Sequence, residues 1–381
     1  MTGRERLLTV LDGRIPDCVP VCPDMSNMIP CRLIGKPFWE IYLYNDPPIW
    51  EAHIACAKYF DIDGFMDGLF NDYNRLEFGD EAHEGPDGET FIVFRSPERI
   101  VTQDSYREHG RRVWRETVDV YYVADPPTAS VPPEKIGLSP IPERWEPLEG
   151  VKPVDRGPTG FARAKELMGD QGLLGLSVIS SAVLRNPQDV YRYYDDPHGH
   201  EEWAAQRVES AERYFAKLVE YDVRPDFVSV GGSGSLVFQT VEIFRQLAFP
   251  AVKRAIELAT AAGIPTHVHS CGPEKELVRI FAEETNLTVI DPLEPPPMGD
   301  CDLAGLKQSF GDRIVLKGNL STTEVMLRGS LATVTEASEQ AIDAAAHGGG
   351  FILSTGDQCG RDTPDENIRA MVQTARTYGR Y

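Results

Sequence analysis

The sequence lacks an apolar run long enough to cross a membrane, and it has little positive charge. The charge-free stretch Gly172–Leu184 is well short of the ~18 to 20 apolar residues of a membrane helix, and charges at Arg4, Glu5 and Arg6 stand where a signal peptide is apolar. Lys and Arg number 38 against 59 Asp and Glu, so the formal net charge is −21. Because such a surface repels nucleic acid and anionic lipid, we expect neither as a partner, and we expect a cytoplasmic protein.

Signals for disulfides and for nucleotide-binding loops are also missing. The seven Cys are an odd number scattered over 381 residues, which argues against a disulfide framework and favours free, metal-binding or catalytic thiols. No GxGxxG follows the first expected strand, and no Lys follows the glycine-rich segment Val230–Ser235 as it does in a P-loop. Hydrophobic residues are 41% and charged residues 25%, which is the composition of an ordinary globular protein.

Strand-like segments alternate with helical segments along most of the chain. The expected strands are Val19–Cys22, Gly64–Phe70, Leu173–Ile179, Phe227–Val230, Pro265–His269, Leu287–Ile290, Ile314–Lys317 and Phe351–Ser354. Expected helices are Arg4–Leu11, Trp50–Phe60, Glu201–Tyr221, Val241–Ala262, Glu274–Glu284, Leu303–Phe310, Thr322–Arg328 and Leu331–Ala346. Buried strands alternating with helices in this way predict an α/β fold, a (β/α)8 TIM barrel that forms one domain over residues 1–381.

One long connection interrupts the alternation. About a hundred residues separate the second and third expected strands, far more than a βα connection needs. Within this stretch Thr90–Ile100 and Arg112–Val123 alternate apolar and polar residues, and Asp125–Pro158 is rich in Pro. We therefore expect a hairpin-rich insertion or lid over residues 71–158.

The residues that carry chemistry stand at the ends of two expected strands. His269 and Cys271 end one β run two positions apart, so their side chains share a side, and Cys359 follows the last strand. In a barrel these strand ends form the active-site face. One His and two Cys make a three-ligand zinc site that leaves a fourth position for substrate or water. A thiol bound there is deprotonated, and because two thiolates already balance the metal charge it stays nucleophilic.

Four further residues are weighed beside this set. Glu294 follows the sixth strand and is either a zinc ligand that substrate displaces, a base for the thiol proton, or an ordinary loop residue. Asp67 and Asn319 end expected strands and either point into the cavity, with a catalytic role, or hold loops together. His267 is expected to face the other side of its strand and to be structural.

Several segments together resemble a known family. These are Arg4–Gly13 with Ile15–Val21, His269–Gly272, Pro292–Asp300, Lys317–Leu320, Gly348–Leu353 and Thr363–Ile368. The chain resembles the uroporphyrinogen decarboxylase superfamily, in particular its corrinoid-dependent methyltransferase branch. The resemblance implies that His269, Cys271 and Cys359 bind zinc. It also implies methyl transfer between a corrinoid, either methylcobalamin or the cobalt of a corrinoid protein, and a thiol or another small acceptor or donor.

The resemblance also bears on the remaining candidates. The similar cobalamin-independent methionine synthases have a Glu between their Cys ligands, and Glu294 matches it in order. Gly232 and Ser233 lie where a backbone could approach a phosphate or the edge of the corrinoid, although a plain βα turn also explains them. The implied partners are a corrinoid protein and a small-molecule donor or acceptor, and a homodimer is left open.

Two other functions compete with methyl transfer. True uroporphyrinogen decarboxylases have an Arg-rich N-terminal motif, but Cys22–Arg32 holds a single Arg here. A polycarboxylate substrate would also meet a net charge of −21. The second alternative is a non-catalytic member of the superfamily that binds a corrinoid or tetrapyrrole.

Overall fold

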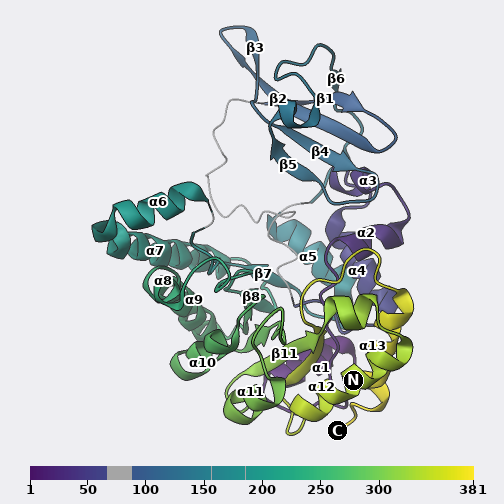
Figure 1. The fold of residues 1–381 in the computed structure, drawn as a ribbon, viewed down its shortest axis with the longest axis vertical. Helices are drawn as coiled ribbons and strands as arrows, with labels where there is room; N and C mark the ends of the chain where they lie inside the picture. Colours follow the sequence, from purple (N-terminus) through teal and green to yellow (C-terminus); the bar gives the residue numbers. More distant parts are fainter. Residues whose placement is uncertain (67–87, 156, 185) are drawn as a thin grey trace.

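The computed structural model describes residues 1–66, 88–155, 157–184 and 186–381. Two sheets organise this part of the chain: a parallel sheet surrounded by helices, and an antiparallel sheet between residues 89 and 147. Figure 1 shows the antiparallel sheet at the top and the parallel strands with their helices below it. Among the described residues there is no helix with the length and apolar character to span a membrane.

The parallel sheet has the α/β character that the sequence predicts. Each strand pairs with the next one along the chain, in the order β12-β11-β10-β9-β8-β7. Nearly all of the strand residues are buried, because helices cover parallel sheets on their faces. The strands are β7 Gly175–Ser177, β8 Phe227–Ser229, β9 Thr266–His269, β10 Val289–Asp291, β11 Val315–Leu320 and β12 Phe351–Thr355.

Helices connect these strands in the regular manner of a βα fold. They are α6 Pro187–Asp195, α7 His200–Leu218, α8 Val241–Ile243, α9 Phe249–Ala261, α10 Lys275–Glu284, α11 Leu303–Phe310, α12 Leu331–Ala345 and α13 Asp365–Thr377. The expected helix Val241–Ala262 is divided, because Phe244–Ala248 is π-helical. Pro250 follows immediately and has no N–H to donate, so the hydrogen-bond register changes before it. Thr322–Leu327 is π-helical as well.

The N-terminal region contributes helices and the two remaining strand positions. Its helices are α1 Gly3–Leu11, α2 Met28–Ile34, α3 Phe38–Tyr42 and α4 Ile49–Phe60. The expected strand Val19–Cys22 is reduced to one parallel bridge between Val21 and Leu353. Of the expected strand Gly64–Phe70, residues 64–66 are not assigned as strand, and residues 67–70 lie outside the described residues.

Contacts place both of these segments between β12 and β7. The Leu353 amide donates to Pro20 O at 2.9 Å, and the Asp63 amide donates to Val21 O at 2.8 Å. Gly64 has φ +103° and packs so closely on Gly172 that a Cβ would lie 3.0 Å from the Gly172 Cα. Residues 20–22 and 62–64 therefore lie where the first two strands of an eight-stranded barrel belong.

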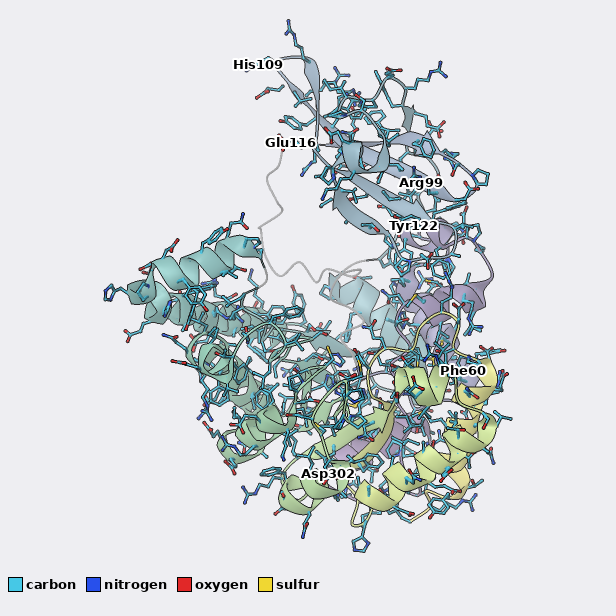
Figure 2. All side chains as sticks on the ribbon, viewed as in Figure 1. Phe60, Arg99, His109, Glu116, Tyr122 and Asp302 are labelled. Carbon is cyan, nitrogen blue, oxygen red and sulfur yellow. The ribbon has the colours of Figure 1, made fainter. Side chains whose placement is uncertain are left out.

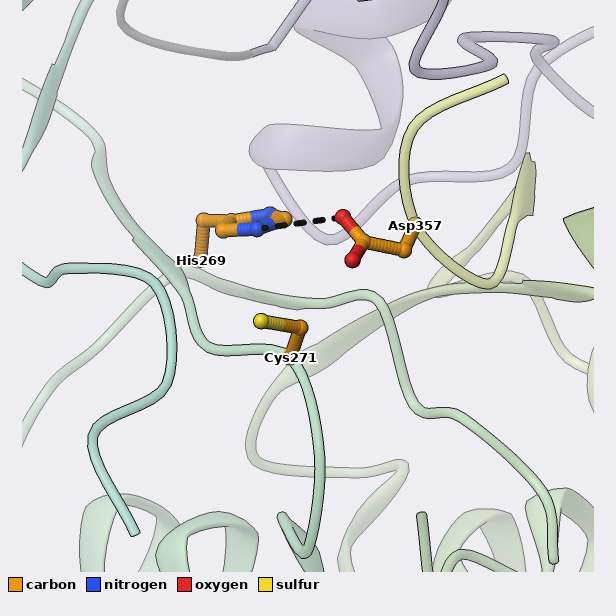
Figure 3. Close-up of side chains that lie close together, drawn as sticks. All are labelled: His269, Cys271 and Asp357. Carbon is orange, nitrogen blue, oxygen red and sulfur yellow. Dashed lines mark ion pairs between the residues drawn. The ribbon is translucent and has the colours of Figure 1, made fainter. Parts of the chain in front are cut away.

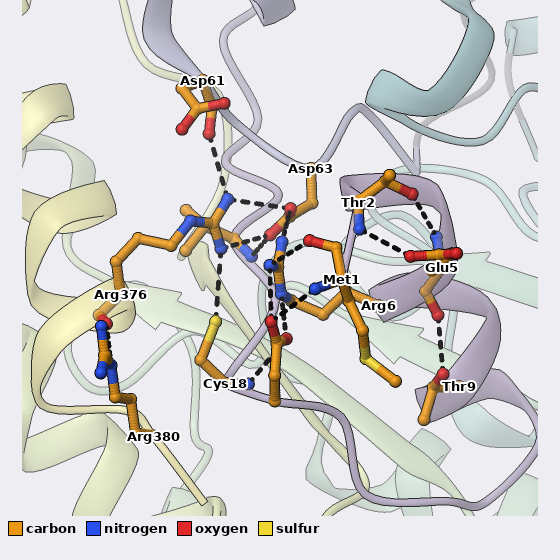
Figure 4. Close-up of polar contacts among 12 residues, drawn as sticks. Met1, Thr2, Glu5, Arg6, Thr9, Cys18, Asp61, Asp63, Arg376 and Arg380 are labelled. Atoms are coloured by element: carbon orange, nitrogen blue, oxygen red, sulfur yellow. Dashed lines mark hydrogen bonds and ion pairs between the residues drawn. The ribbon is translucent and has the colours of Figure 1, made fainter.

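A buried carboxylate joins the two ends of this arrangement (Figure 4). Asp63, whose side chain is 1% exposed, accepts hydrogen bonds from Arg6 Nη1 at 2.5 Å and from Arg376 Nη2 at 2.8 Å. Its second oxygen accepts the Val21 amide at 2.8 Å. Arg6 also pairs with Asp17 at 2.8 Å. Helices α1 and α13 are therefore fixed to the same barrel position by one charged group.

The expected insertion forms an antiparallel sheet in its described part. The strands β1 and β2 pair as a hairpin across Ser96–Glu98, as the alternation over Thr90–Ile100 predicts. Strand β3 pairs with the end of β2 as a second hairpin across His109 and Gly110, and β4 pairs with the beginning of β2. The elements are β1 Glu89–Arg95, β2 Arg99–Glu108, β3 Arg111–Trp114, β4 Val118–Tyr122, β5 Thr128–Val131 and β6 Glu146–Pro147, followed by α5 Gly157–Met168.

The antiparallel sheet packs on the N-terminal helices. Leu43 is buried with Ile92 and Ile100 of the sheet, and the Phe38 amide donates to Val123 O at 2.9 Å. Figure 2 shows Tyr122 at the end of the sheet near α3 and His109 at the opposite tip. This one end of the sheet is therefore attached to the α/β body.

Candidate metal centre

Two loops at the C-terminal ends of parallel strands bring three potential metal ligands together (Figure 3). His269 ends β9 and Cys271 follows it, while Asp357 follows β12. One ligand atom of each residue lies within 4.8 Å of the others, and His269 Nε2 is 3.7 Å from Asp357 Oδ1. His269 and Cys271 therefore meet as the sequence predicts, and the third member of the cluster is an Asp.

Asp357 has an unusual backbone. Its φ is +146°, in a region that residues other than Gly rarely adopt. Strain of this kind persists only where the surrounding structure holds it, and it concentrates at functional sites. The strained turn carries the Asp357 carboxylate towards His269.

Asp291 at the end of β10 orients His269. Its Oδ1 lies 3.0 Å from His269 Nδ1 and 3.1 Å from His267 Nε2, and its Oδ2 accepts a hydrogen bond from Lys317 Nζ. The prediction that His267 faces away from His269 is wrong, since residues two apart in a strand share a side. His267 is structural in the sense expected, because its Nδ1 is 3.0 Å from the Ser229 hydroxyl.

Neighbouring opposite charges shift the pKa values of the buried Asp291 and His269. Burial raises the pKa of Asp291, but Lys317, His267 and His269 more than offset that effect and hold the pKa well below its usual range. Burial lowers the pKa of His269, but Asp291 and a hydrogen bond to Cys271 raise it well above its usual range. A metal ion binding at Nε2 therefore has to displace a proton.

The glycine-rich loop after β8 lies against Cys271. Ser233 Oγ is 2.9 Å from Cys271 Sγ, and the Gly232 amide donates to Ser181 Oγ at 2.8 Å. Gly232 also approaches Ser180 so closely that a Cβ would lie 2.5 Å from its Oγ. Of the two residues expected to bind a cofactor, Ser233 thus contacts the cluster, and Gly232 contacts Ser180 and Ser181.

Two carboxylates connect the loop after β9 to the loop after β10. The Gly272 amide donates to Glu294 Oε2 at 2.6 Å, and the Leu293 amide donates to Glu274 Oε2 at 2.7 Å. Burial raises the pKa of both Glu294 and Glu274. Glu294 is not one of the three clustered ligands, and it positions the residue that follows Cys271.

Cys359 is adjacent in sequence to the cluster but is not part of it. Its sulfur is not within the group formed by His269, Cys271 and Asp357. The side chain is fully buried, the Cys359 amide donates to Asp24 O at 2.9 Å, and burial raises the pKa of its thiol to about 12. Its sulfur therefore lies in the protein interior in this conformation.

The other predicted residues have separate positions. Asn319 on β11 donates through Nδ2 to Leu293 O at 3.0 Å, so it supports the loop that carries Glu294. Asp67 lies outside the described residues. Lys317 ends an expected strand and Asp291 directly follows another, but their contact with each other and with His269 depends on the register of three neighbouring strands, which no local sequence pattern reports. Asp357 reaches the cluster through a turn with φ +146°, which no sequence motif reports.

Comparison with known proteins finds one family model that matches the C-terminal half. The family model described as uroporphyrinogen decarboxylase (URO-D) matches residues 194–378. The matched segment is just under half of the 381-residue chain, and over this segment the sequence is similar to the URO-D family. The matched segment contains His269, Cys271, Asp291 and Asp357.

Solved structures extend the likeness over the full length. A methyltransferase from Methanosarcina mazei superimposes with a TM-score of 0.58 at 16% identity, covering 99% of this chain and 99% of that one. The whole chain, including the part before residue 194, thus shares the fold of that protein. A B12-independent methionine synthase from Shewanella sp. W3-18-1, in complex with selenomethionine, gives a TM-score of 0.35 at 12% identity over 60% of this chain and 69% of that one. No curated protein matches the sequence.

Proposed function

We propose that this chain is a zinc-dependent methyltransferase that moves a methyl group between a corrinoid and a thiol. The observation that carries the proposal is the cluster of His269, Cys271 and Asp357 at the C-terminal strand ends, with His269 Nδ1 already engaged by Asp291. The resemblance to corrinoid-dependent methyltransferases and the fold shared with a methyltransferase support the same reaction class.

The chemistry of the cluster suits zinc. Zn²⁺ takes N and S ligands at ~2.0 to 2.3 Å, so two ligands of a tetrahedral ion are about 3.5 Å apart. The 3.7 Å between His269 Nε2 and Asp357 Oδ1 is close to that spacing, and the 4.8 Å limit of the cluster requires only small side-chain movements. One thiolate and one carboxylate balance the two positive charges, as two thiolates would.

The loop after β12 offers two candidates for the third ligand. The structure brings Asp357 to the cluster, whereas the resemblance implies Cys359, two residues further along. We propose that this loop supplies the third ligand in either case and leaves one position open for the thiol. Substitution of each residue decides between them.

The side chains around the open position have distinct tasks. When bound, Zn²⁺ supplies a positive charge that lowers the pKa of the acceptor thiol. Glu294 accepts the thiol proton: one of its oxygens is engaged by Gly272, the other has no hydrogen bond among the described residues, and its raised pKa suits a base. Ser233 Oγ lies 2.9 Å from Cys271 Sγ, so its hydroxyl can donate to the thiolate of a metal-bound Cys271 and keep that sulfur in place.

The proposed methyl transfer is a nucleophilic displacement at the methyl carbon. The acceptor sulfur forms a bond to the methyl carbon, and the Co–C bond breaks with its electron pair on cobalt, which passes from Co(III) to Co(I). In the opposite direction Co(I) attacks the methyl group of a donor, and the leaving sulfur takes up a proton. The same residues serve both directions.

A rim of exposed apolar side chains suits a corrinoid protein as the partner. Val237 is 53% exposed, Phe238 66% and Met298 70%, on the loops after β8 and β10. Val237 packs against Gly272, the neighbour of Cys271, and Gly299 approaches it from the other loop. Exposed apolar patches of this kind mark binding surfaces. We propose that Gly232 and this rim receive the corrinoid.

The first experiment measures zinc per chain and methyl transfer from methylcobalamin to a panel of thiols. We expect one zinc in the wild type, loss of zinc and activity in Cys271→Ser, and loss of zinc in either Asp357→Asn or Cys359→Ser. Cys301→Ser is the matched control, because Cys301 is buried outside the cluster and should keep both. A wild type without zinc, together with full activity in Cys271→Ser, would refute the proposal.

A decarboxylase is the second candidate, favoured by the match to the URO-D family model. It predicts that the purified chain releases CO₂ from a porphyrinogen carboxylate, and that Cys271→Ser does not reduce the rate. The same protein preparations therefore distinguish the two functions.

A further inference from the structure

We propose that Asp291 is the positioning residue for the metal-binding His269, and that Lys317 is the buried counter-ion that makes this carboxylate tolerable at the barrel centre. The inference rests on the metal site of the proposed function. It concerns residues that hold a ligand and touch no substrate.

The sheet register places the three residues side by side. Asp291 stands opposite His269 in the β9–β10 pairing, and Lys317 follows Leu316, the partner of Ile290 in the β10–β11 pairing. Register neighbours in a parallel sheet point to the same side. Three adjacent strands therefore direct an imidazole, a carboxylate and an ammonium group towards one another.

The hydrogen bonds fix which ring nitrogen of His269 is available. Asp291 Oδ1 is 3.0 Å from Nδ1, so Nδ1 donates to this carboxylate, and Nε2, 3.7 Å from Asp357 Oδ1, is the nitrogen that would bind a metal once its own proton is displaced. A carboxylate on the far nitrogen of a metal-binding His both orients the ring and raises its basicity. Removal of such a partner typically weakens metal binding about 10- to 100-fold.

His267 completes the support from the same strand as His269. Its Nε2 lies 3.1 Å from Asp291 Oδ1, and its Nδ1 lies 3.0 Å from the Ser229 hydroxyl on β8. This geometry lets Nε2–H donate to Asp291 while Nδ1 accepts the Ser229 hydroxyl. Asp291 Oδ1 is thus held between two rings and has little freedom to leave His269.

Lys317 neutralises the buried negative charge of Asp291. The side chains are 2% and 1% exposed, and a buried carboxylate without a cation is strongly unfavourable. The negative charge of Asp291 and the positive charge of Lys317 also cancel each other. Because the pair is neutral, it does not change the net charge of a site made of a divalent metal and two anionic ligands. Asp291 therefore orients His269 without adding net charge to the site.

A charge-balanced double variant separates positioning from folding. Asp291→Asn alone leaves Lys317 buried without its anion and should destabilise the chain, whereas Asp291→Asn with Lys317→Met removes both charges and should recover much of that loss. In both variants we expect the zinc dissociation constant, measured by competition with a chromophoric chelator, to rise about 10- to 100-fold.

Asp226→Asn is the matched control. Asp226 is also a buried carboxylate with two cations, Arg4 at 2.7 Å and Lys165 at 2.9 Å, but it stands before β8 at the opposite end of the strands. It should lose stability and keep wild-type zinc affinity. The visible spectrum of the Co²⁺-substituted protein provides a second readout, which should change in the Asp291 variants and not in Asp226→Asn.

The outcomes distinguish the inference from the function on which it rests. A wild type that binds one zinc, with a dissociation constant in the double variant within threefold of the wild type, would overturn the role of Asp291 and leave the metal site standing. A wild type that binds no zinc overturns the proposed function and this inference together. If Asp291→Asn does not fold, the double variant supplies the measurement.

Discussion

Replacing Asp63 by Asn should destabilise the fold by about 3 kcal/mol. The carboxylate is 1% exposed and serves Arg6, Arg376 and the Val21 amide. Breaking a buried ion pair by removing one partner costs ~3 to 5 kcal/mol, because the other charge stays buried without compensation. The lower end applies here, since Arg6 keeps Asp17, which is 43% exposed, and the Arg376 side chain is itself 21% exposed.

Urea unfolding at pH 7, followed by circular dichroism and tryptophan fluorescence, measures this effect. Because the pair is buried, the loss should be nearly the same at 0.15 M and 1 M NaCl. The comparison variant is Arg328→Ala, which removes an exposed pair with Glu324 whose side chains are 68% and 71% accessible. It should cost less than about 0.5 kcal/mol. A loss below about 1 kcal/mol for Asp63→Asn would show that this carboxylate does not hold the barrel together.

Three further predictions concern the core, pH and a helix end. Phe281→Ala should cost about 3 to 5 kcal/mol by urea unfolding, since Phe281 is fully buried, whereas Phe238→Ala, at a side chain 66% exposed, should cost under about 1 kcal/mol. Burial lowers the pKa of His53 to about 3, so below pH ~6.5 the unfolded chain binds a proton that the folded chain does not. Between pH 7 and pH 5 the wild type should therefore lose about 2 kcal/mol more stability than His53→Gln, and equal losses would contradict this assignment. Ser330→Ala, which removes the N-cap of α12, should lower the unfolding free energy by about 1 kcal/mol, while Ser330→Asp should not.

Local sequence patterns predict most strands of the parallel sheet. β9, β11 and β12 lie within one to three residues of their expected bounds, because short apolar runs with flanking turns define buried strands. The strand at Val19–Cys22 was not recoverable in its observed form. Its single bridge depends on Leu353, and no local signal reports a partner so distant in the sequence.

The site likewise has residues that local sequence predicts and residues that it does not. His269 and Cys271 followed from their spacing at one strand end, and the structure brings them together. Asp357 follows from a turn with φ +146°, which depends on how the loop packs and not on its composition. Asp291 depends on the register of β9 against β10, and register is a property of the folded sheet.

The pairing of β12 with residues 20–22 has a consequence for synthesis. Thr355 hydrogen-bonds to the Asp24 amide, 331 positions away along the chain. At about 5 to 20 residues per second, the ribosome releases the first of these partners roughly 15 to 65 seconds before the second. During that interval residues 20–22 lack their β12 neighbour, and Asp63 has only one of its two Arg. Nascent chains of this protein are therefore expected to depend on chaperones until β12 and α13 emerge.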